Sequence, residues 1–128
     1  MRAGLGKYPV SMAICNQNLL AAMRAGVMLV TGTDSGNPTL FHGPALHREL
    51  QLWIEAGVPP SVALQAATYN GAQLLRASDR MGLIKKGYEA DLLLVDGNPL
   101  KDISVTERIS MVMLKGERIS RSELFDQQ

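Results

Sequence analysis

The stretch Leu29-Val30-Thr31-Gly32-Thr33-Asp34-Ser35-Gly36 joins an apolar run to an acidic residue that lies between two glycines. A buried strand brings the residue that follows it to the edge of a sheet, and glycines allow a sharp turn and the close approach of a ligand. In a β/α barrel, catalytic residues follow the carboxyl ends of the strands. The same residue types also form ordinary turns and helix caps. From these residues alone, Asp34 is either an active-site acid at a strand end or a structural turn residue.

The segments around Asp34 alternate between helical and extended patterns. Residues 16–25 predict a helix that ends at Gly26, and residues 27–31 predict a strand. A second helix is expected from Pro44 to Ala56, with an apolar stripe of Leu46, Leu50, Trp53 and Ile54. A helix, a glycine and an apolar strand in succession are typical of an α/β fold with a parallel sheet.

A third helix is expected after Pro59 and Pro60, with Ser61 as its N-cap and its end near Leu75. Its predicted packing face consists of Val62, Leu64, Ala67, Leu74 and Leu75. The pattern changes near Met81 to short strands separated by glycines, expected at 90–95, 108–115 and 117–120. The last two are joined by Lys115-Gly116, which predicts a hairpin.

Composition excludes several classes of protein. The 128 residues include 13 basic and 12 acidic side chains, so the net charge of +1 offers no electrostatic footprint for nucleic acid or an anionic membrane. No apolar run reaches the length of a membrane span, and the N-terminal sequence does not resemble a signal peptide. We therefore expect a cytoplasmic protein. Cys15 is the only cysteine, which excludes an internal disulfide and a thiolate zinc cluster, and it is expected to be at least half-buried.

Six motifs occur along the chain in an order that resembles the C-terminal part of the amidohydrolase superfamily, close to its imidazolonepropionase-like and prolidase-like metal-dependent hydrolases. The motifs are Gly32 to Gly36, His42-Gly43, Arg48 to Pro59, Ala66 to Ala72, Gly82 to Leu92, and Val95 to Leu100. Each motif is weak alone, whereas six in order are specific. The run from Gly82 to Leu92 marks, in this family, the return of the chain from the barrel to a small β-sandwich.

The resemblance implies an α/β fold that is incomplete relative to the family. Residues 1–80 would form a partial β/α-barrel segment, with a helix, the strand ending at Asp34 and two helices. Residues 81–128 would form β-sandwich strands.

The resemblance also implies roles for two residues. Asp34 matches the family's aspartate that contacts a divalent metal and acts as general base for the attacking water, and His42 becomes a candidate for substrate binding. Family members hydrolyse C–N bonds in small molecules such as cyclic amides, dipeptides and aminated rings. Zinc is the metal we expect in the parent family.

Most metal ligands of the family have no counterpart in this sequence. The family's His-x-His pair, its carboxylated lysine and its two further histidines are missing, and the only histidines are His42 and His47. The chain is also shorter than the roughly 200–250 residues of a full barrel. We therefore expect that Asp34 meets a metal only with ligands supplied from elsewhere, and that this chain alone binds no metal and lacks hydrolase activity.

A separate metal site of Asp34, His42 and His47 is a weaker hypothesis, because two ligands on one helix face usually lie three or four positions apart and these histidines are five apart. His47 is more simply a solvated or helix-packing residue. Glu49 is expected to be a structural partner in the first turns of its helix, and Asp91 a turn residue at a strand start.

An isolated barrel strand leaves open edges that favour association. The expected partner is a second copy of the chain or the missing portion of the barrel. Two classes of function remain open: part of a metal-dependent amidohydrolase, or a non-catalytic oligomeric remnant or small ligand-binding protein.

Overall fold

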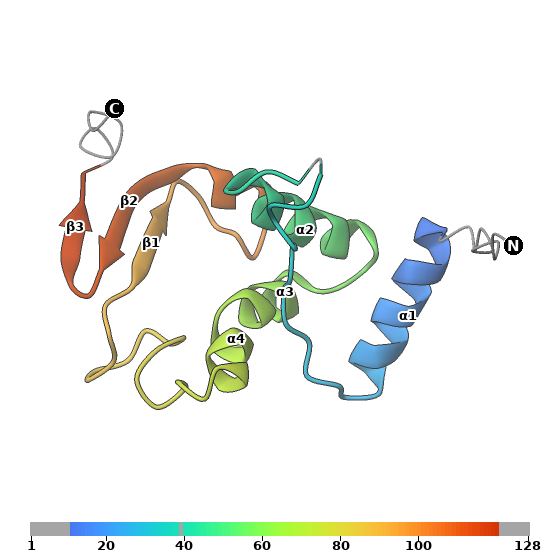
Figure 1. Cartoon of the computed structure of the whole chain (residues 1–128), viewed down its shortest axis with the longest axis horizontal. Helices are drawn as coiled ribbons and strands as arrows, with labels where there is room; N and C mark the ends of the chain where they lie inside the picture. The colour runs from blue at the N-terminus through green and yellow to red at the C-terminus, as the bar shows by residue number, and fades with distance from the viewer. Residues whose placement is uncertain (1–10, 39, 121–128) are drawn as a thin grey trace, which may run out of the picture.

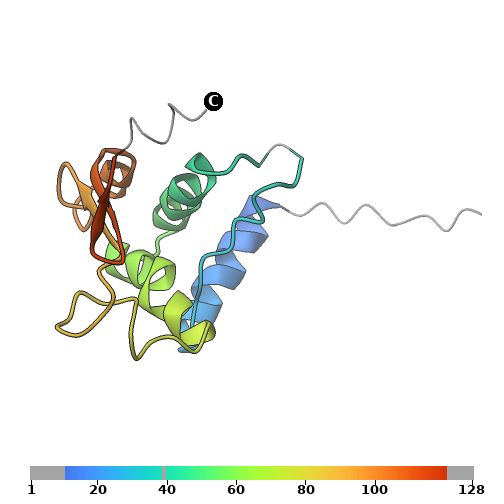
Figure 2. The ribbon, with the colours of Figure 1, turned by 60° about the vertical axis from the view of Figure 1, so that its left-hand side comes forward.

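The computed structural model describes residues 11–38 and 40–120 as an assembly of helices beside a small antiparallel sheet (Figure 1). The sheet and the first helix lie at opposite ends of the molecule, with the other helices between them (Figures 1 and 2). The elements are α1 (Met12–Arg24), α2 (Pro44–Glu55), α3 (Pro60–Ala67), α4 (Tyr69–Leu74), β1 (Leu92–Val95), the 3₁₀ helix η1 (Ile103–Glu107), β2 (Ile109–Leu114) and β3 (Glu117–Ile119).

Helix α1 begins four residues earlier than the apolar pattern predicts. The hydroxyl of Ser11 accepts a hydrogen bond from the backbone N–H of Ile14 at 3.3 Å, which caps the helix N-terminus. Gly26, with φ +74°, follows the helix as expected. Leu19, Leu20 and Met23 pack against the core, whereas Cys15 is exposed, so the expectation that this cysteine is at least half-buried is wrong.

Residues 27–31 do not form the predicted strand. Their contacts are with α3 and α4: the N–H of Thr31 donates to the carbonyl of Ala66 at 3.5 Å, and the amide of Asn70 donates to the carbonyl of Leu29 at 2.7 Å. A parallel strand is defined by its neighbours, and no neighbouring strand lies beside this segment within the described residues. Residues 27–31 have the apolar pattern of a buried strand, but no strand of the described residues pairs with them.

Helix α2 matches the prediction, with Pro44 in its first turn and an end one residue before Ala56. The predicted third helix is divided in two at Thr68, where φ is −129° and ψ is −89°. Ser61 is not its cap, because the helix already begins at Pro60 after Pro59. Its predicted packing face is partly wrong. Ala63 and Ala66 are fully buried, whereas Leu74 and Leu75 are 62% and 75% exposed.

The core joins the two halves of the chain. Its buried cluster consists of Leu50 from α2, Val58, Ala63 from α3 and Ile103 from η1. Trp53 and Ile54 of the predicted α2 stripe pack against this cluster. Side chains extend the contact between α2 and η1, because His47 Nδ1 lies 3.1 Å from Thr106 Oγ1 and the Gln51 amide donates to Glu107 at 2.7 Å.

The three predicted strands are confirmed as one antiparallel sheet with the order β1-β2-β3. Leu94 pairs with Met111, and Met113 pairs with Arg118 across the predicted hairpin. Lys115 and Gly116 both have positive φ, 51° and 85°, as a two-residue hairpin turn of the favoured twist requires. The carboxylate of Asp91 accepts the N–H of Lys115 at 2.7 Å, in agreement with its expected role at the strand start.

No helix of the described segments is long and apolar enough to cross a membrane. The division into units at residues 80 and 81 stays a prediction, and residues 1–10 and 121–128, at the outer ends of those units, lie outside the described residues.

Candidate active site

Asp34 lies in a tight turn whose backbone is held by its own hydrogen bonds. The carbonyl of Asp34 accepts the backbone N–H of Asn37 at 3.2 Å and the side-chain amide of Asn37 at 2.9 Å. The N–H of Gly36 donates to the carbonyl of Leu40 at 3.1 Å, and the N–H of Leu40 donates to the carbonyl of Asn37 at 3.0 Å. These bonds close the loop on the side that follows Asp34.

The residues of this turn that adopt positive φ differ from those that the glycine pattern predicts. Gly36 has φ +103°, as expected, but Gly32 does not lie in the left-handed region, and Asp34 itself does, with φ 51°. A non-glycine residue adopts this conformation at a cost, and Asp and Asn tolerate it best. The carboxylate of Asp34 is exposed, and no side chain of residues 11–38 or 40–120 forms a hydrogen bond or an ion pair with it.

The two histidines lie in different surroundings. The His42 ring is exposed and lies beside the turn, since a Cβ placed on Gly36 would be 3.5 Å from its Nε2. His47 is half-buried and contacts Thr106 of η1, which agrees with the expectation of a helix-packing residue. His42 is thus near the Asp34 turn, whereas the ring of His47 is engaged with another element.

The described residues do not fit a metal ion by themselves. Nowhere in residues 11–38 and 40–120 do three His, Cys, Asp or Glu side chains come together in a group that could hold one. Two imidazoles and a carboxylate would be adequate ligands chemically. The structure does not bring Asp34, His42 and His47 together for that purpose.

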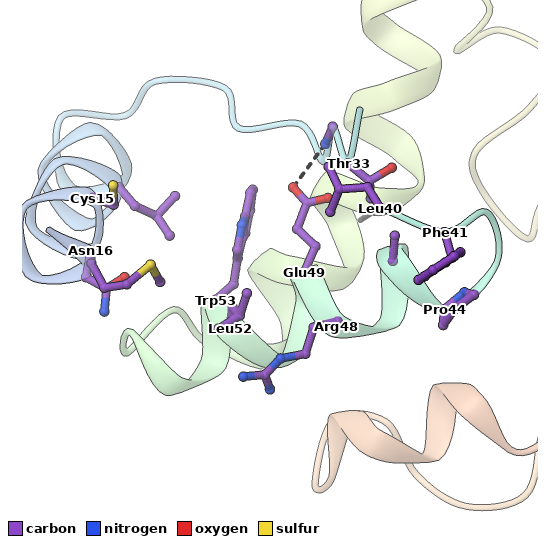
Figure 3. A pocket seen from close by; sticks show the side chains of 14 residues that line it. Cys15, Asn16, Thr33, Leu40, Phe41, Pro44, Arg48, Glu49, Leu52 and Trp53 are labelled. Carbon is purple, nitrogen blue, oxygen red and sulfur yellow. Dashed lines mark hydrogen bonds between the residues drawn. The ribbon is translucent and has the colours of Figure 1, made fainter. Parts of the chain in front are cut away.

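Glu49 is a structural partner, as the sequence predicts, but the group that it binds lies outside its own helix. Its Oε1 accepts the backbone N–H of Gly32 at 3.0 Å, across 17 positions of sequence, so the carboxylate binds the Asp34 loop rather than the first turn of its own helix (Figure 3). Its Oε2 is buried and has no hydrogen-bond partner within the described part of the chain. Glu49 lies four positions before Trp53, on the apolar side of α2, and a carboxylate at such a position signals a specific partner.

A cavity of about 600 Å³ lies between α1, α2 and the Asp34 loop (Figure 3). Its wall is mainly apolar and includes Leu19, Phe41 and Trp53, with the polar groups of Arg48 and Glu49 beside them. Arg48 is engaged by Glu55 at 2.8 Å. Phe41 is 74% exposed, so a large apolar surface at this cavity is left uncovered within the described residues.

Comparison with known proteins decides the family. A family model described as "Amidohydrolase family" matches residues 16–119, most of the sequence. The chain belongs to the amidohydrolase family. Among curated amidohydrolase relatives, ochratoxinase of Aspergillus niger is 38% identical over 88 residues, which is 66% of this chain and 17% of that protein. Adenine deaminase 1 of Latilactobacillus sakei is 41% identical over 71 residues, which is 56% of this chain and 11% of that protein.

Solved structures of the family superpose on most of this chain. A Xaa-Pro dipeptidase with methionine bound in its active site has a TM-score of 0.75 and 37% identity, and the match covers 82% of this chain and 25% of the dipeptidase. Molinate hydrolase has a TM-score of 0.79 and 27% identity, over 88% of this chain and 27% of the hydrolase. The chain therefore spans about a quarter of these amidohydrolase structures and a smaller share of the curated relatives.

Proposed function

We propose that this chain contributes Asp34 to the active site of an amidohydrolase that cleaves C–N bonds in small molecules, and that polypeptide outside the described residues completes the site. The observation that carries the proposal is the Asp34 turn. Its carboxylate is exposed and unpaired, while its backbone is held in a left-handed conformation by neighbouring groups. A carboxylate that has no structural partner, on a backbone held in a fixed conformation, favours a functional role over a turn role.

The chemistry that suits an exposed carboxylate is proton transfer. A carboxylate at the reacting centre can accept a proton from the water that attacks the carbon of a C–N bond, and can return it to the leaving nitrogen. The names of two relatives, a Xaa-Pro dipeptidase and an adenine deaminase, are consistent with C–N bonds as the substrate class. The exposed ring of His42, next to Gly36, is placed to meet a substrate at the same turn.

The proposal includes a divalent metal, with zinc as the first candidate. The ground for the metal is the family to which the chain belongs, not a ligand set among the residues of this chain. Because the described residues contain no suitable group of ligands, we assign no reaction step of this chain to a metal. Ligands for it would come from the polypeptide that completes the site, with Asp34 as this chain's contribution.

The completing polypeptide would pack where this chain leaves an apolar surface and an extended segment that no described strand pairs with. Residues 27–31 have no strand partner among the described residues, and the cavity beside α1 and α2 has an exposed apolar wall. We propose that residues 1–80 supply the last strand and helix units of a β/α barrel and that residues 81–128 supply strands of a small β-sandwich. A second copy of the chain could cover the same surface, and the apolar cavity would then suit a non-catalytic, ligand-binding oligomer.

Zinc content tests whether the site of this chain is incomplete. The purified chain and its Asp34→Asn variant would be incubated with zinc, passed through gel filtration and measured by elemental analysis. We expect no zinc above the buffer blank in either protein, because the ligand set is missing. A stoichiometric amount of zinc in the wild type that is lost in Asp34→Asn would contradict this, since the site would then be built by this chain or its oligomer.

A further inference from the structure

We infer that Glu49 is a positioning residue for Asp34, because it holds the start of the Asp34 turn through the backbone N–H of Gly32. This inference rests on the proposed function of Asp34 and extends it to a residue on α2. Glu49 Oε1 lies 3.0 Å from Gly32 N, two residues before Asp34. A hydrogen bond from an N–H to a carboxylate is stronger than one to a neutral acceptor.

The turn is held from both sides of Asp34. On the side that follows it, Asn37 donates two hydrogen bonds to the carbonyl of Asp34. Thr33 Oγ1 lies 2.7 Å from Ser35 Oγ, a contact that spans Asp34 within the turn itself. On the side that precedes Asp34, the bond to Glu49 ties Gly32 to a helix. Among the side-chain hydrogen bonds of residues 32–37, the bond to Glu49 is the one that fixes the turn relative to α2.

The second carboxylate oxygen of Glu49 carries a cost that packing alone does not explain. Glu49 Oε2 is buried without a hydrogen-bond partner in the described part of the chain, and an unsatisfied buried polar atom opposes folding. The surrounding wall, with Trp53 and Leu52 on the same helix, would accept an apolar side chain of similar size. The hydrogen bond from Gly32 N–H to Glu49 Oε1 explains why a carboxylate lies at this apolar position.

Three variants separate this role from general packing. Glu49→Gln keeps a side-chain oxygen that can accept the Gly32 N–H, whereas Glu49→Leu removes both oxygens. Glu55→Leu is the matched control, since Glu55 lies on the same helix, is exposed and pairs with Arg48 instead of the loop. Amide hydrogen exchange by NMR on the full chain reports the Gly32 and Asn37 amides, with the amides of the β2 and β3 pair as the reference for global opening.

We expect Glu49→Leu to accelerate exchange of the Gly32 and Asn37 amides by at least about tenfold, the loss that fits a hydrogen bond to a charged group. The sheet amides should keep their rates, Glu49→Gln should restore most of the protection, and Glu55→Leu should behave as wild type. The inference is overturned if Gly32 alone responds, if the sheet amides accelerate equally, or if Glu49→Gln fails to restore protection.

Failure of this inference and failure of the proposed function give different results. The exchange measurement needs no catalysis, so it can succeed while Asp34 proves irrelevant to hydrolysis. In an active amidohydrolase that carries this segment, Glu49→Leu should lower kcat with little change in KM, and Glu49→Gln should recover kcat. An unchanged kcat in Glu49→Leu beside a large loss in Asp34→Asn would overturn the positioning role and leave the role of Asp34 intact.

Discussion

Gly82 packs closely against α4. A Cβ on this residue would be 2.7 Å from the Cβ of Ala72 and 3.0 Å from the Cα of Tyr69, and its φ is +90°. Gly87 has nearly the same φ, +88°, with no atom within 4 Å of the added Cβ. These two glycines separate the steric cost of a methyl group from its conformational cost.

Gly82→Ala should therefore destabilise the protein more than Gly87→Ala. Both variants carry the left-handed cost of about 1–2 kcal/mol, and only Gly82→Ala adds overpacking, typically about 1–3 kcal/mol. Chemical denaturation of both variants measures the difference in the free energy of unfolding. Equal losses in the two variants would show that the contact with Ala72 relaxes without cost.

At the residue scale, the sequence identifies Asp34 and its neighbours but not the residue that holds them. Asp34, Gly36 and Asp91 are marked by motif and turn chemistry. Asp34 and Gly36 lie in a turn, and Asp91 lies at a strand start, as expected. The sequence predicts a structural role for Glu49 but not its partner, because Gly32 is 17 positions away and a backbone N–H carries no sequence signal. The expectation that Cys15 is at least half-buried fails for a related reason, because the apolar pattern of α1 does not show which part of the helix packs against another element.

At the element scale, Asp102 caps the 3₁₀ helix η1. Its Oδ1 accepts the side-chain hydroxyl of Ser104 at 2.7 Å and the backbone N–H of Ser104 at 2.9 Å. The hydroxyl bond of Ser104 and then its backbone bond lower the pKa of Asp102 below the ordinary value for aspartate. Desolvation opposes them, and the charge of Arg108 adds the smallest lowering effect. The stabilisation from this carboxylate is therefore complete above the ordinary pKa of aspartate and is lost as the pH falls through the lowered pKa.

Asp102→Asn should weaken the loss of stability that the protein shows at acidic pH. Asparagine also caps helices well but does not titrate, so the variant should unfold at a similar temperature at neutral pH and lose less stability on acidification. Thermal denaturation from neutral pH down to the acid limb measures both quantities, with Asp96→Asn as an exposed control in the neighbouring loop. An unchanged acid slope in Asp102→Asn would show that the capping bonds of Asp102 do not distinguish the folded from the unfolded chain.

Local signals determine which elements the sequence predicts correctly. Helix α2 and the hairpin of β2 and β3 follow from Pro44 and from Lys115-Gly116, whose chemistry is contained within a few residues. The strand at 27–31 and the continuous helix from 61 to 75 fail, because a strand needs neighbours and the break at Thr68 is not encoded by a proline or glycine. Helix η1 does have a local signal, because Asp102 caps its N-terminus by accepting the backbone N–H of Ser104.

At the scale of the whole molecule, the chain has a buried core and, beside it, a partly exposed apolar surface. The core formed by Leu50, Val58, Ala63 and Ile103 ties η1 to the helices, while the cavity beside α1 and α2 keeps an exposed apolar wall. The match to a quarter of the Xaa-Pro dipeptidase structure supports the proposal that further polypeptide covers this wall. From the sequence, the family could be recognised through its ordered motifs. The open apolar wall of the cavity could not, because it depends on how α1, α2 and the Asp34 loop pack.

The most direct measurement of the central proposal is hydrolysis by a graft. Residues 16–119 would replace the matching quarter of the Xaa-Pro dipeptidase, and kcat/KM for a Xaa-Pro dipeptide would be compared among the graft, its Asp34→Asn variant and an Asp79→Asn control. The account predicts an active graft in which Asp34→Asn lowers kcat/KM by about 10²–10⁴-fold, the usual contribution of a general base, while Asp79→Asn, at an exposed position, has no effect. A folded graft that hydrolyses the dipeptide equally well with and without Asp34→Asn, or not at all, would contradict it.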